Sequence, residues 1–458
     1  MSGGLADREF GHWTKIIRPG ESFQTPSAYL TTVMGDVDCA ASRLTGMQKR
    51  PLLHGPAIEE DLPIIFNEYC TTWGAPSASS LYAIAERLRD KGVRYLVIDC
   101  GWYRREGTNW FTSMGDWEIS QNDFPEGLRQ TLEHIRKCGM IPGIWFEMEV
   151  CGVESTAFHM VNHLLKRDGL PITSGNRRFW DFCDPFVINY LKEKVISFLK
   201  THGFGYLKID YNDNLGIGCD GAESLGEGLR RQMQAVQEFI RLIQQEVPDI
   251  VIENCASGGH RLEPSMVTLT SMSSFSDAHE CEEVPIIAAN LHRVILPRQS
   301  QIWAVLRKDD SLQRMVYSLA STMLGRMCLS GDIHELSEEQ WGIVGEAIAF
   351  YQLVSPIIKD GKTNRFGSPI QSYRHPKGWQ GIIRTSRDGS QMMIVVHKFG
   401  GDASDIIKLP LPAFGCYEIV QVFSDHTVDV RLEHDHFLCV LEKPFSAVCI
   451  LLRITMLI

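Results

Sequence analysis

The chain has 458 residues, of which 44% are hydrophobic and 22% are charged. These proportions are typical of globular proteins, and they exclude disordered and fibrous classes. The 45 basic and 56 acidic side chains leave a formal net charge of −11, which argues against binding to nucleic acid or to an anionic membrane.

The sequence gives no sign of a segment that inserts into a membrane or directs secretion. No apolar run approaches the roughly 18–20 residues that span a bilayer, and Asp7, Arg8 and Glu9 lie where a signal peptide would need an apolar core. The 13 cysteines include no CxxC pair, so neither a disulfide framework nor a zinc ribbon is indicated. We therefore expect a cytoplasmic protein with free thiols.

Residues 1–60 are rich in Gly, Pro, Ser and Thr, which predicts irregular or β-type structure. Beyond them, short β-branched or aromatic runs alternate with amphipathic stretches. The predicted strands are 63–70, 95–102, 141–149, 206–211, 250–256, 273–277, 301–306 and 327–330. The predicted helices are 79–91, 125–138, 185–202, 225–246, 311–324 and 337–355.

This rhythm of eight strands and intervening helices predicts an α/β fold, a (β/α)8 TIM barrel over residues 61–358. A doubly wound open sheet is the alternative, and it is disfavoured because no Gly-rich phosphate turn follows the first strand. Farther on, the helical period stops. Alternating runs at 380–385, 391–398, 417–423 and 439–452 predict a C-terminal all-β sandwich domain over residues 359–458.

In a barrel, chemistry is found where strands end, and the fourth predicted strand ends in a polar run. Because strand side chains alternate, Lys208, Asp210 and Asn212 share one face. The neighbouring cation and amide should lower the pKa of Asp210 and keep this carboxyl ionised. Such a carboxylate suits a nucleophile, a metal ligand or a structural ion pair.

The next two strand ends are also polar. After the fifth strand, Gly258 and Gly259 let the backbone approach a ligand closely, although a plain tight turn explains the same pair. After the sixth, Asp277 and His279 offer a carboxylate and an imidazole. A helix cap is the structural alternative there, and no third ligand with suitable spacing supports a metal site.

Tryptophans accompany carboxylates at two further strand ends. Trp102 follows Asp99, and Trp145 precedes Glu147. Indole faces stack on pyranose rings while carboxylates accept hydrogen bonds from sugar hydroxyls, but tryptophan is also a common core residue. Several carboxylates and tryptophans at barrel strand ends, without a clear metal cluster, fit glycoside hydrolysis by two carboxyl groups.

In this order, the motifs resemble those of glycoside hydrolase family 36, the α-galactosidase family of retaining α-glycosidases built on a (β/α)8 barrel. The resemblance runs from about residue 19 to the C-terminus. It rests on six motifs, Ile98–Trp102, Gly115–Trp117, Gly143–Glu147, Lys208–Asn212, Cys255–Arg261 and Ser276-Asp277.

The resemblance implies roles for individual residues. Asp210 matches the nucleophile of the family, and Asp277 matches its acid/base. Residues in the family's substrate-binding positions or motifs are Asp99, Cys100, Trp102, Trp145, Arg178, Lys208, Asn212, Cys255, Ser257, Gly258 and Arg261. The implied activity is exo-acting hydrolysis of terminal α-galactosides of small oligosaccharides by double displacement. Neither a metal nor an organic cofactor is expected, and the family makes a homo-oligomer plausible.

Three features depart from the family pattern. Cys100 replaces the second of two adjacent aspartates, so one hydroxyl contact is lost and a related sugar, an α-N-acetylgalactosaminide or a β-L-arabinopyranoside, stays open. Residues 278–280 read Ala-His-Glu where many relatives carry a Thr-Asp pair. Of the large N-terminal β-domain of most relatives, residues 1–60 hold only an apparent tail and linker, which leaves activity and assembly open.

Other functions remain open at this stage. A galactosyl transferase of the raffinose-synthase type would use the same double displacement with a sugar acceptor in place of water. A sugar-binding protein without activity is the alternative from another class, and the presence of both Asp210 and Asp277 argues against it. A metal-dependent barrel lyase or hydrolase is the most distant alternative.

Overall fold

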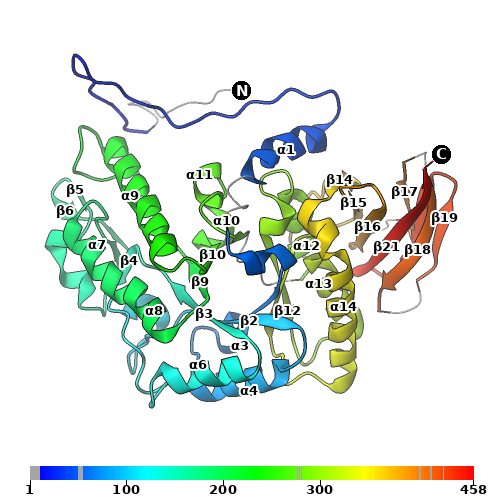
Figure 1. Ribbon diagram of the computed structural model, residues 1–458, viewed down its shortest axis with the longest axis horizontal. Coiled ribbons are helices and arrows are strands. Elements are labelled where there is room, and N and C mark those ends of the chain that lie inside the picture. The colour runs from blue at the N-terminus through cyan, green and yellow to red at the C-terminus, as the bar shows by residue number, and fades with distance from the viewer. Residues whose placement is uncertain are drawn as a thin grey trace.

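The computed structural model describes residues 11–49, 55–275, 277, 279, 281–401, 404–412, 415–425 and 428–457. A closed barrel with its helices forms the larger part, and antiparallel sheets of the C-terminal segment stand beside it (Figure 1). An extended N-terminal segment crosses above the helices at one end of the barrel (Figure 1).

The barrel consists of eight parallel strands in the order β1-β13-β12-β11-β10-β9-β3-β2, closed by pairing of β2 with β1. Each of the eight predicted strands corresponds to one of them, and the predicted TIM barrel is confirmed. The strands are β1 Ile64–Asn67, β2 Val93–Ile98, β3 Ile141–Phe146, β9 Tyr206–Ile209, β10 Val251–Asn254, β11 Met272–Ser274, β12 Ser300–Leu306 and β13 Arg326–Gly331.

Helices surround the barrel. The longer ones are α4 Ala78–Leu88, α6 Leu128–Lys137, α7 Pro185–Leu191, α8 Phe198–His202, α9 Leu225–Glu246, α12 Val284–Leu291, α13 Leu312–Thr322 and α14 Glu338–Asp360. Single-turn α-helices are α3 Tyr69–Thr72, α5 Trp110–Ser113 and α11 Pro264–Val267, and α10 Ala256–Gly259 is a short turn whose backbone is not α-helical at Ser257 and Gly258. Short 3-10 segments are Gly46–Gln48, Ala57–Asp61, Ala157–His159, Val161–His163 and Pro297–Gln299, and a π-helical segment, Lys192–Ser197, joins α7 to α8.

The helix starts follow from capping residues in the sequence. Ser77 and Ser337 each form a capping box, in which the serine side chain accepts from the third helical amide and that residue's side chain bonds back. Asp184 caps α7, where Pro185 takes the first helical position because its missing N–H is not needed there. The sequence pattern did not predict α12, whose residues are apolar almost throughout and show little amphipathic contrast.

The C-terminal segment forms two antiparallel sheets around a second apolar cluster, as predicted for a sandwich. One sheet has the order β14-β15-β16-β21-β18 and the other β17-β20-β19. The strands are β14 Lys362–Phe366, β15 Trp379–Thr385, β16 Gln391–Lys398, β17 Ile406–Pro410, β18 Gly415–Phe423, β19 Val430–Glu433, β20 His436–Val440 and β21 Ser446–Leu457.

Helix α14 joins the barrel to these sheets. It packs against α13 and against β15, β16 and β18, and the first C-terminal strand, β14, follows it directly. It is the one helix among the described residues that is long and apolar enough to cross a membrane, and the apolar window is half buried inside the protein. We therefore interpret α14 as a core helix.

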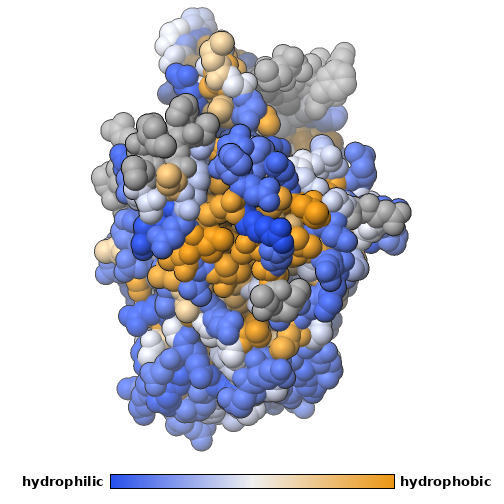
Figure 2. Space-filling view, turned by 90° about the vertical axis from the view of Figure 1, so that its right-hand side faces the viewer, coloured by the Kyte–Doolittle hydropathy of each residue, from blue (hydrophilic) through white to orange (hydrophobic). Residues whose placement is uncertain are grey.

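The C-terminal sheets also carry an apolar surface. On the side of the molecule where these sheets lie, apolar side chains gather among polar ones (Figure 2). Ile406 on β17 and Val420 on β18 are among the exposed apolar residues of this domain, with 57% and 37% of their surface accessible.

The N-terminal segment contains no strand among its described residues, 11–49 and 55–63. A helix, α1 Val37–Thr45, forms instead, with the Asp36 carboxylate accepting from the Cys39 amide at 2.9 Å. Of the expected irregular or β-type structure, residues 11–36 show the irregular form, and helix α1 was not predicted. Residues 13–16 are held by the start of α9, where Trp13 Nε1 and Lys15 Nζ both donate to the Glu227 carboxylate.

Two small antiparallel sheets follow β3. One has the order β4-β8-β7, with β4 Val150–Gly152, β7 Thr173–Ser174 and β8 Arg177–Phe179, and the other pairs β5 Lys166–Arg167 with β6 Leu170–Pro171. These two small sheets lie in the loop after β3, and one of them supplies an arginine to the site described below.

Candidate active site

A small pocket lies at the carboxyl ends of the barrel strands. Its lining comes from residues on or just after β1, β2, β3, β9, β10, β11 and β12, with one more residue from α5. The lining residues are Tyr69, Asp99, Cys100, Trp110, Trp145, Lys208, Asp210, Asn212, Cys255, Ser274, Asp277, His279 and Trp303. Eight of these were predicted from the sequence, including both carboxyl groups proposed for catalysis.

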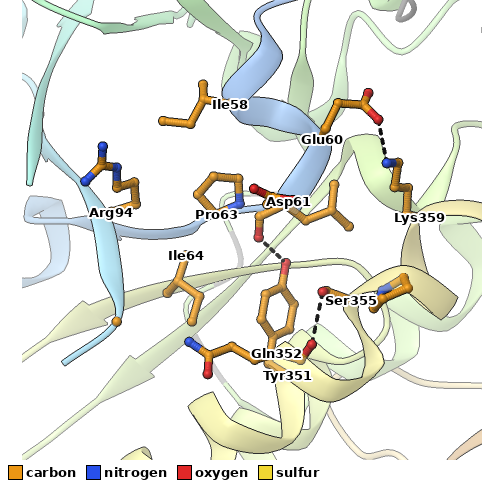
Figure 3. Close-up of a pocket in the computed structure, with 13 residues that line it drawn as sticks. Ile58, Glu60, Asp61, Pro63, Ile64, Arg94, Tyr351, Gln352, Ser355 and Lys359 are labelled. Carbon is orange, nitrogen blue, oxygen red and sulfur yellow. Dashed lines mark hydrogen bonds and ion pairs between the residues drawn. The ribbon is translucent and has the colours of Figure 1, made fainter.

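A larger cleft, of about 730 Å³, lies at the opposite end of the barrel (Figure 3). It is lined by residues before β1 and β2 and by the second half of α14. Three of its polar side chains are engaged, since Tyr351 Oη donates to the Leu62 carbonyl at 3.1 Å and Lys359 pairs with Glu60. The chemistry therefore concentrates in the smaller pocket, of about 110 Å³.

Asp210 follows the last residue of β9, and Lys208 lies two residues earlier on the same face, as strand alternation predicted. The Asp210 carboxylate accepts from the Tyr211 and Ser257 amides at 2.8 and 3.0 Å and from Trp145 Nε1 at 3.1 Å. Burial works to raise the pKa of Asp210, but the Lys208 ammonium and these donors outweigh burial and lower it. The carboxylate is therefore held ionised.

The turn after β10 positions one of these donors, the Ser257 amide. Cys255 to Gly259 follow the strand, and Ala256, Ser257, Gly258 and Gly259 all have positive φ, at 53°, 50°, 62° and 120°. Left-handed backbone at two non-glycine residues is costly and is retained where the surroundings enforce it. The turn points the Ser257 amide at Asp210, and Ser257 Oγ donates to Asn212 Oδ1 at 2.7 Å.

Asp277 lies after β11 and lines the same pocket. Burial and the nearby negative charge of Asp210 raise the pKa of its carboxyl above the usual value. The pKa values of two carboxyl groups in one pocket are thus shifted in opposite directions, down for Asp210 and up for Asp277. That division is what an acid/base and a nucleophile require.

Asp99 sits at the end of β2 and is 2% exposed. Its Oδ2 accepts from Lys208 Nζ and from Asn67 Nδ2, both at 2.7 Å, and its Oδ1 accepts from the Cys100 amide at 2.9 Å. Lys208 Nζ also lies 5.1 Å from the centre of the Trp303 ring. The Lys208 ammonium therefore binds Asp99 and lies beside the Trp303 ring, and all three residues line the pocket.

Two buried glutamates support the site, and neither was among the predicted catalytic or substrate-binding residues. Glu68 accepts from the Asp99 amide at 2.9 Å, and burial raises its pKa to about 8. Glu147 accepts from the Asn212 amide at 2.7 Å and from Asn212 Nδ2 at 3.0 Å, and burial raises its pKa to about 7. Both directly follow the observed strands β1 and β3 and lie near the ends of the predicted strands 63–70 and 141–149, and that position was the signal that could have found them.

Five residues predicted as substrate contacts do not line the pocket. Ser257 and Gly258 act through the turn behind Asp210. The Arg261 guanidinium pairs with the Glu149 carboxylate at 2.5 and 3.0 Å and covers the Tyr211 ring at 4.0 Å, so it braces the loop after β9.

Trp102 is fully buried below the pocket. Its Nε1 donates to the Trp145 carbonyl at 2.9 Å, and its ring stacks near Trp117 and Phe198. The chain turns inward at Gly101, whose φ of 98° suits glycine. Placing Trp102 among the substrate contacts is corrected to a supporting position under Trp145.

Arg178 also points away from the pocket. It lies 4.0 Å from the centre of the Phe158 ring, and its Nη1 donates to the Phe158 carbonyl at 2.9 Å. Its neighbour Arg177, on the opposite face of β8, pairs with Glu147 at 3.6 Å and lies 5.5 Å from the centre of the Trp110 ring. Because successive strand residues face opposite sides, the arginine beside the pocket is Arg177 and not Arg178.

Aromatic side chains that the sequence did not single out form the rim. The rings of Tyr69, Trp73 and Trp303 lie 5.6–6.1 Å from that of His279. Trp73 is 51% exposed. These rings come from the segments after β1 and β11 and from β12, so only the closed barrel brings them together.

A family model described as melibiase matches residues 22–361. The chain belongs to this family. The match covers the whole barrel and includes every residue that lines the pocket.

Curated relatives agree with the family. The chain is 24% identical over 373 residues to α-galactosidase 1 of Pediococcus pentosaceus, which covers 78% of this chain and 50% of the relative. It is 23% identical over 408 residues to α-galactosidase AgaA of Geobacillus stearothermophilus, covering 86% and 54%. The chain thus spans about half the length of the curated relatives it matches.

Solved structures share the fold. A variant of AgaA from Geobacillus stearothermophilus in complex with stachyose superposes with a TM-score of 0.80 at 20% identity, covering 96% of this chain and 62% of that one. An α-galactosidase from Lactobacillus brevis gives 0.76 at 17% identity, covering 92% and 58%. The barrel and the C-terminal sheets therefore have the arrangement found in these proteins.

Proposed function

We propose that the protein is a retaining exo-α-glycosidase that hydrolyses terminal α-galactosides of small oligosaccharides. One observation carries this proposal. Asp210 is held ionised by Lys208 and three hydrogen-bond donors, while Asp277, lining the same pocket, has a raised pKa. Membership in the melibiase family and the α-galactosidase relatives support the sugar.

In this mechanism Asp210 attacks the anomeric carbon while Asp277 gives its proton to the departing glycosidic oxygen. A glycosyl ester forms on Asp210 and the leaving sugar is released. Esterification removes the negative charge that raises the pKa of Asp277, so Asp277 stays ionised after giving up its proton and can take a proton from water. The hydroxide attacks the same carbon, the ester breaks, and the anomeric configuration is retained.

The supporting groups have defined tasks. Lys208 and the donors on Asp210 keep the nucleophile ionised, Trp145 offers an indole wall beside it, and Asp99 can accept from a sugar hydroxyl. Cys100 lines the pocket beside Asp99 with a neutral thiol, because burial raises its pKa. A thiol accepts hydrogen bonds weakly, so a β-L-arabinopyranoside, which lacks a hydroxymethyl group, is the second candidate substrate.

We also propose that the protein works in the cytoplasm as a homo-oligomer. All 13 cysteines are free thiols, which suits a reducing compartment. Fractionation of the native source and size-exclusion chromatography with light scattering test the two parts of this proposal.

The test is hydrolysis of nitrophenyl α-galactoside, α-N-acetylgalactosaminide and β-L-arabinopyranoside by the wild type and by Asp210→Asn. We expect turnover of one α-galactoside-like sugar, with a loss of at least about 10³-fold in Asp210→Asn because no nucleophile remains. Asp249→Asn, an exposed carboxylate before β10, is the matched control and should keep wild-type turnover.

Proton NMR of the first product then reports the anomer, and addition of a sugar acceptor separates hydrolysis from galactosyl transfer. Wild-type turnover in Asp210→Asn would overturn the assignment of the nucleophile. Binding of galactose by calorimetry without turnover of any substrate would make the protein a sugar-binding module.

A further inference from the structure

Away from the catalytic pocket, on the outer wall of the barrel, we propose that Glu86, His134 and Cys138 bind a divalent cation of the zinc type. Glu86 lies on α4, His134 in the last turn of α6, and Cys138 at the residue where α6 ends. Residues four apart share one face of a helix, so the imidazole and the thiol point to the same side. Helix α4 packs against that side and supplies the carboxylate.

The three ligand atoms are spaced as a tetrahedral metal ion requires. His134 Nε2 and Glu86 Oε1 are 3.0 Å apart, Cys138 Sγ and His134 Nε2 are 3.7 Å apart, and Cys138 Sγ and Glu86 Oε1 are 3.9 Å apart. Zinc bond lengths at a tetrahedral angle give about 3.3, 3.6 and 3.5 Å for the same pairs. Adjustments of a few tenths of an ångström, which the half-exposed Glu86 side chain can make, would seat the ion.

The donor set and the surroundings favour such a cation. A thiolate, an imidazole and a carboxylate are a combination that zinc accepts, whereas magnesium and calcium prefer oxygen alone. The site lies at the C-terminus of α6, where the helix dipole favours positive charge. The Tyr82 ring meets the His134 ring edge to face at 4.5 Å and fixes its orientation.

Solvent can reach the proposed metal site. Glu86 is half exposed, so solvent can supply the ion and a water molecule as the fourth ligand. Arg89 now donates to both Glu86 oxygens, at 2.8 and 3.1 Å, but exposed ion pairs of this kind contribute little to stability and rearrange easily. On binding, the thiol proton of Cys138 passes to solvent, an Sγ–metal bond forms, and no group changes oxidation state.

A cation here would clamp α4 to α6, two neighbouring helices of the barrel wall. It would take no part in the proposed hydrolysis, because none of its ligands lines the catalytic pocket. The proposal is therefore independent of the proposed function, and it predicts stabilisation by metal without a change in turnover.

The experiment uses the full chain, stripped of metal and kept reduced, with Co²⁺ as a spectroscopic probe. We expect one Co²⁺ per chain with a thiolate-to-cobalt charge-transfer band and the strong visible bands of tetrahedral cobalt, and displacement of both by Zn²⁺. Cys138→Ser should abolish the charge-transfer band, while His134→Gln and Glu86→Gln should each weaken binding at least tenfold. Cys183→Ser, at an exposed cysteine elsewhere, is the control and should bind like the wild type.

A charge-transfer band that survives in Cys138→Ser would place the cobalt on another of the cysteines and overturn the proposal. So would wild-type affinity in both Glu86→Gln and His134→Gln, since both side chains reach the surface and neither substitution should prevent folding. A wild-type chain that binds neither Co²⁺ nor Zn²⁺ would show that the three groups form only a hydrogen-bonded cluster with Arg89.

Discussion

Around the pocket floor, one lysine ammonium serves several buried carboxyl groups. Lys208 pairs with Asp99 directly and lowers the pKa of Asp210 and of Glu68 through space. One positive charge cannot balance three negative ones in a buried setting, so one carboxyl group must keep its proton. Glu68 is that group, because burial and the neighbouring Asp99 raise its pKa to about 8.

This makes stability depend on pH. The pKa of Glu68 rises from 4.5 to about 8 on folding, so its contribution is fully present below pH 4.5 and is lost as pH rises through 8. The shift corresponds to about 5 kcal/mol in the free energy of unfolding between pH 4.5 and 9. In Glu68→Gln, which reproduces the protonated form, we expect that part of the pH dependence to vanish. Urea denaturation at pH 5 and pH 9 measures how much the free energy of unfolding changes between these pH values. The same change in Glu68→Gln as in the wild type would show that Glu68 does not titrate in this range.

Cys100 gives a second prediction at the scale of a residue. Cys100→Asp would place a strong acceptor beside Asp99 in the pocket lining. We expect kcat/KM for the nitrophenyl α-galactoside to rise about tenfold relative to the β-L-arabinopyranoside, the size of one hydrogen bond to a charged group. Cys100→Ser is the control for side-chain size and should shift the ratio little. An equal change in kcat/KM for both sugars would show that the side chain at this position does not contact the hydroxymethyl group.

Among the elements, the left-handed turn after β10 is the most constrained. A Cβ added at Gly259 would lie 2.3 Å from the carbonyl oxygen of Phe275, and the φ of 120° is itself unfavourable for other residues. We expect Gly259→Ala to shift the turn, to move the Ser257 amide from Asp210, and to lower kcat at least tenfold. Thermal unfolding and kinetics together measure both effects.

Gly342→Ala is the matched control. Gly342 lies exposed within α14, and a Cβ there meets nothing within 4 Å. Alanine in a helix interior is more stable than glycine by about 0.5–1 kcal/mol, so this variant should be more stable with unchanged kcat. Equal kcat values in Gly259→Ala and Gly342→Ala would show that the turn does not position the donor on Asp210.

Some features of the structure could be predicted from local sequence patterns, and others could not. The eight barrel strands were predictable because each is a short apolar run between turn residues and capped helices. Strand alternation also placed Lys208, Asp210 and Asn212 on one face correctly. The choice between Arg177 and Arg178 depended on the register of the β4-β8 pairing, which no local pattern encodes. The aromatic rim of Tyr69, Trp73 and Trp303 around His279 depended on closure of the barrel.

Across the whole molecule, two buried arginines differ in what they contact. Arg384 on β15 donates to Thr363 Oγ1 and to the Leu324 carbonyl, both at 2.9 Å, and no carboxylate among the described residues pairs with it. Burial lowers its pKa to about 9. Arg326 on β13, by contrast, forms a buried ion pair with Glu59.

Replacing each with methionine should have opposite effects. Arg384→Met removes an uncompensated buried charge between barrel and C-terminal sheets, so we expect it to raise the free energy of unfolding by about 1–2 kcal/mol. Arg326→Met leaves the Glu59 carboxylate buried without its partner and should lower it by about 3–5 kcal/mol. Guanidinium denaturation measures both, and a comparable loss in the two variants would mean that Arg384 has compensating contacts.

Closure of the barrel joins segments far apart in the chain. Strand β1 pairs with β13, and Ser330 Oγ donates to the Asn67 carbonyl across 263 residues. During synthesis, β1, β2, β3 and β9 therefore leave the ribosome long before the strand that completes their sheet. Contacts of such long range slow folding, because a large loop must be ordered before they form. Asp99, Lys208 and Asp210 are all made early, yet the chain acquires its pocket only when nearly the whole barrel has been synthesised.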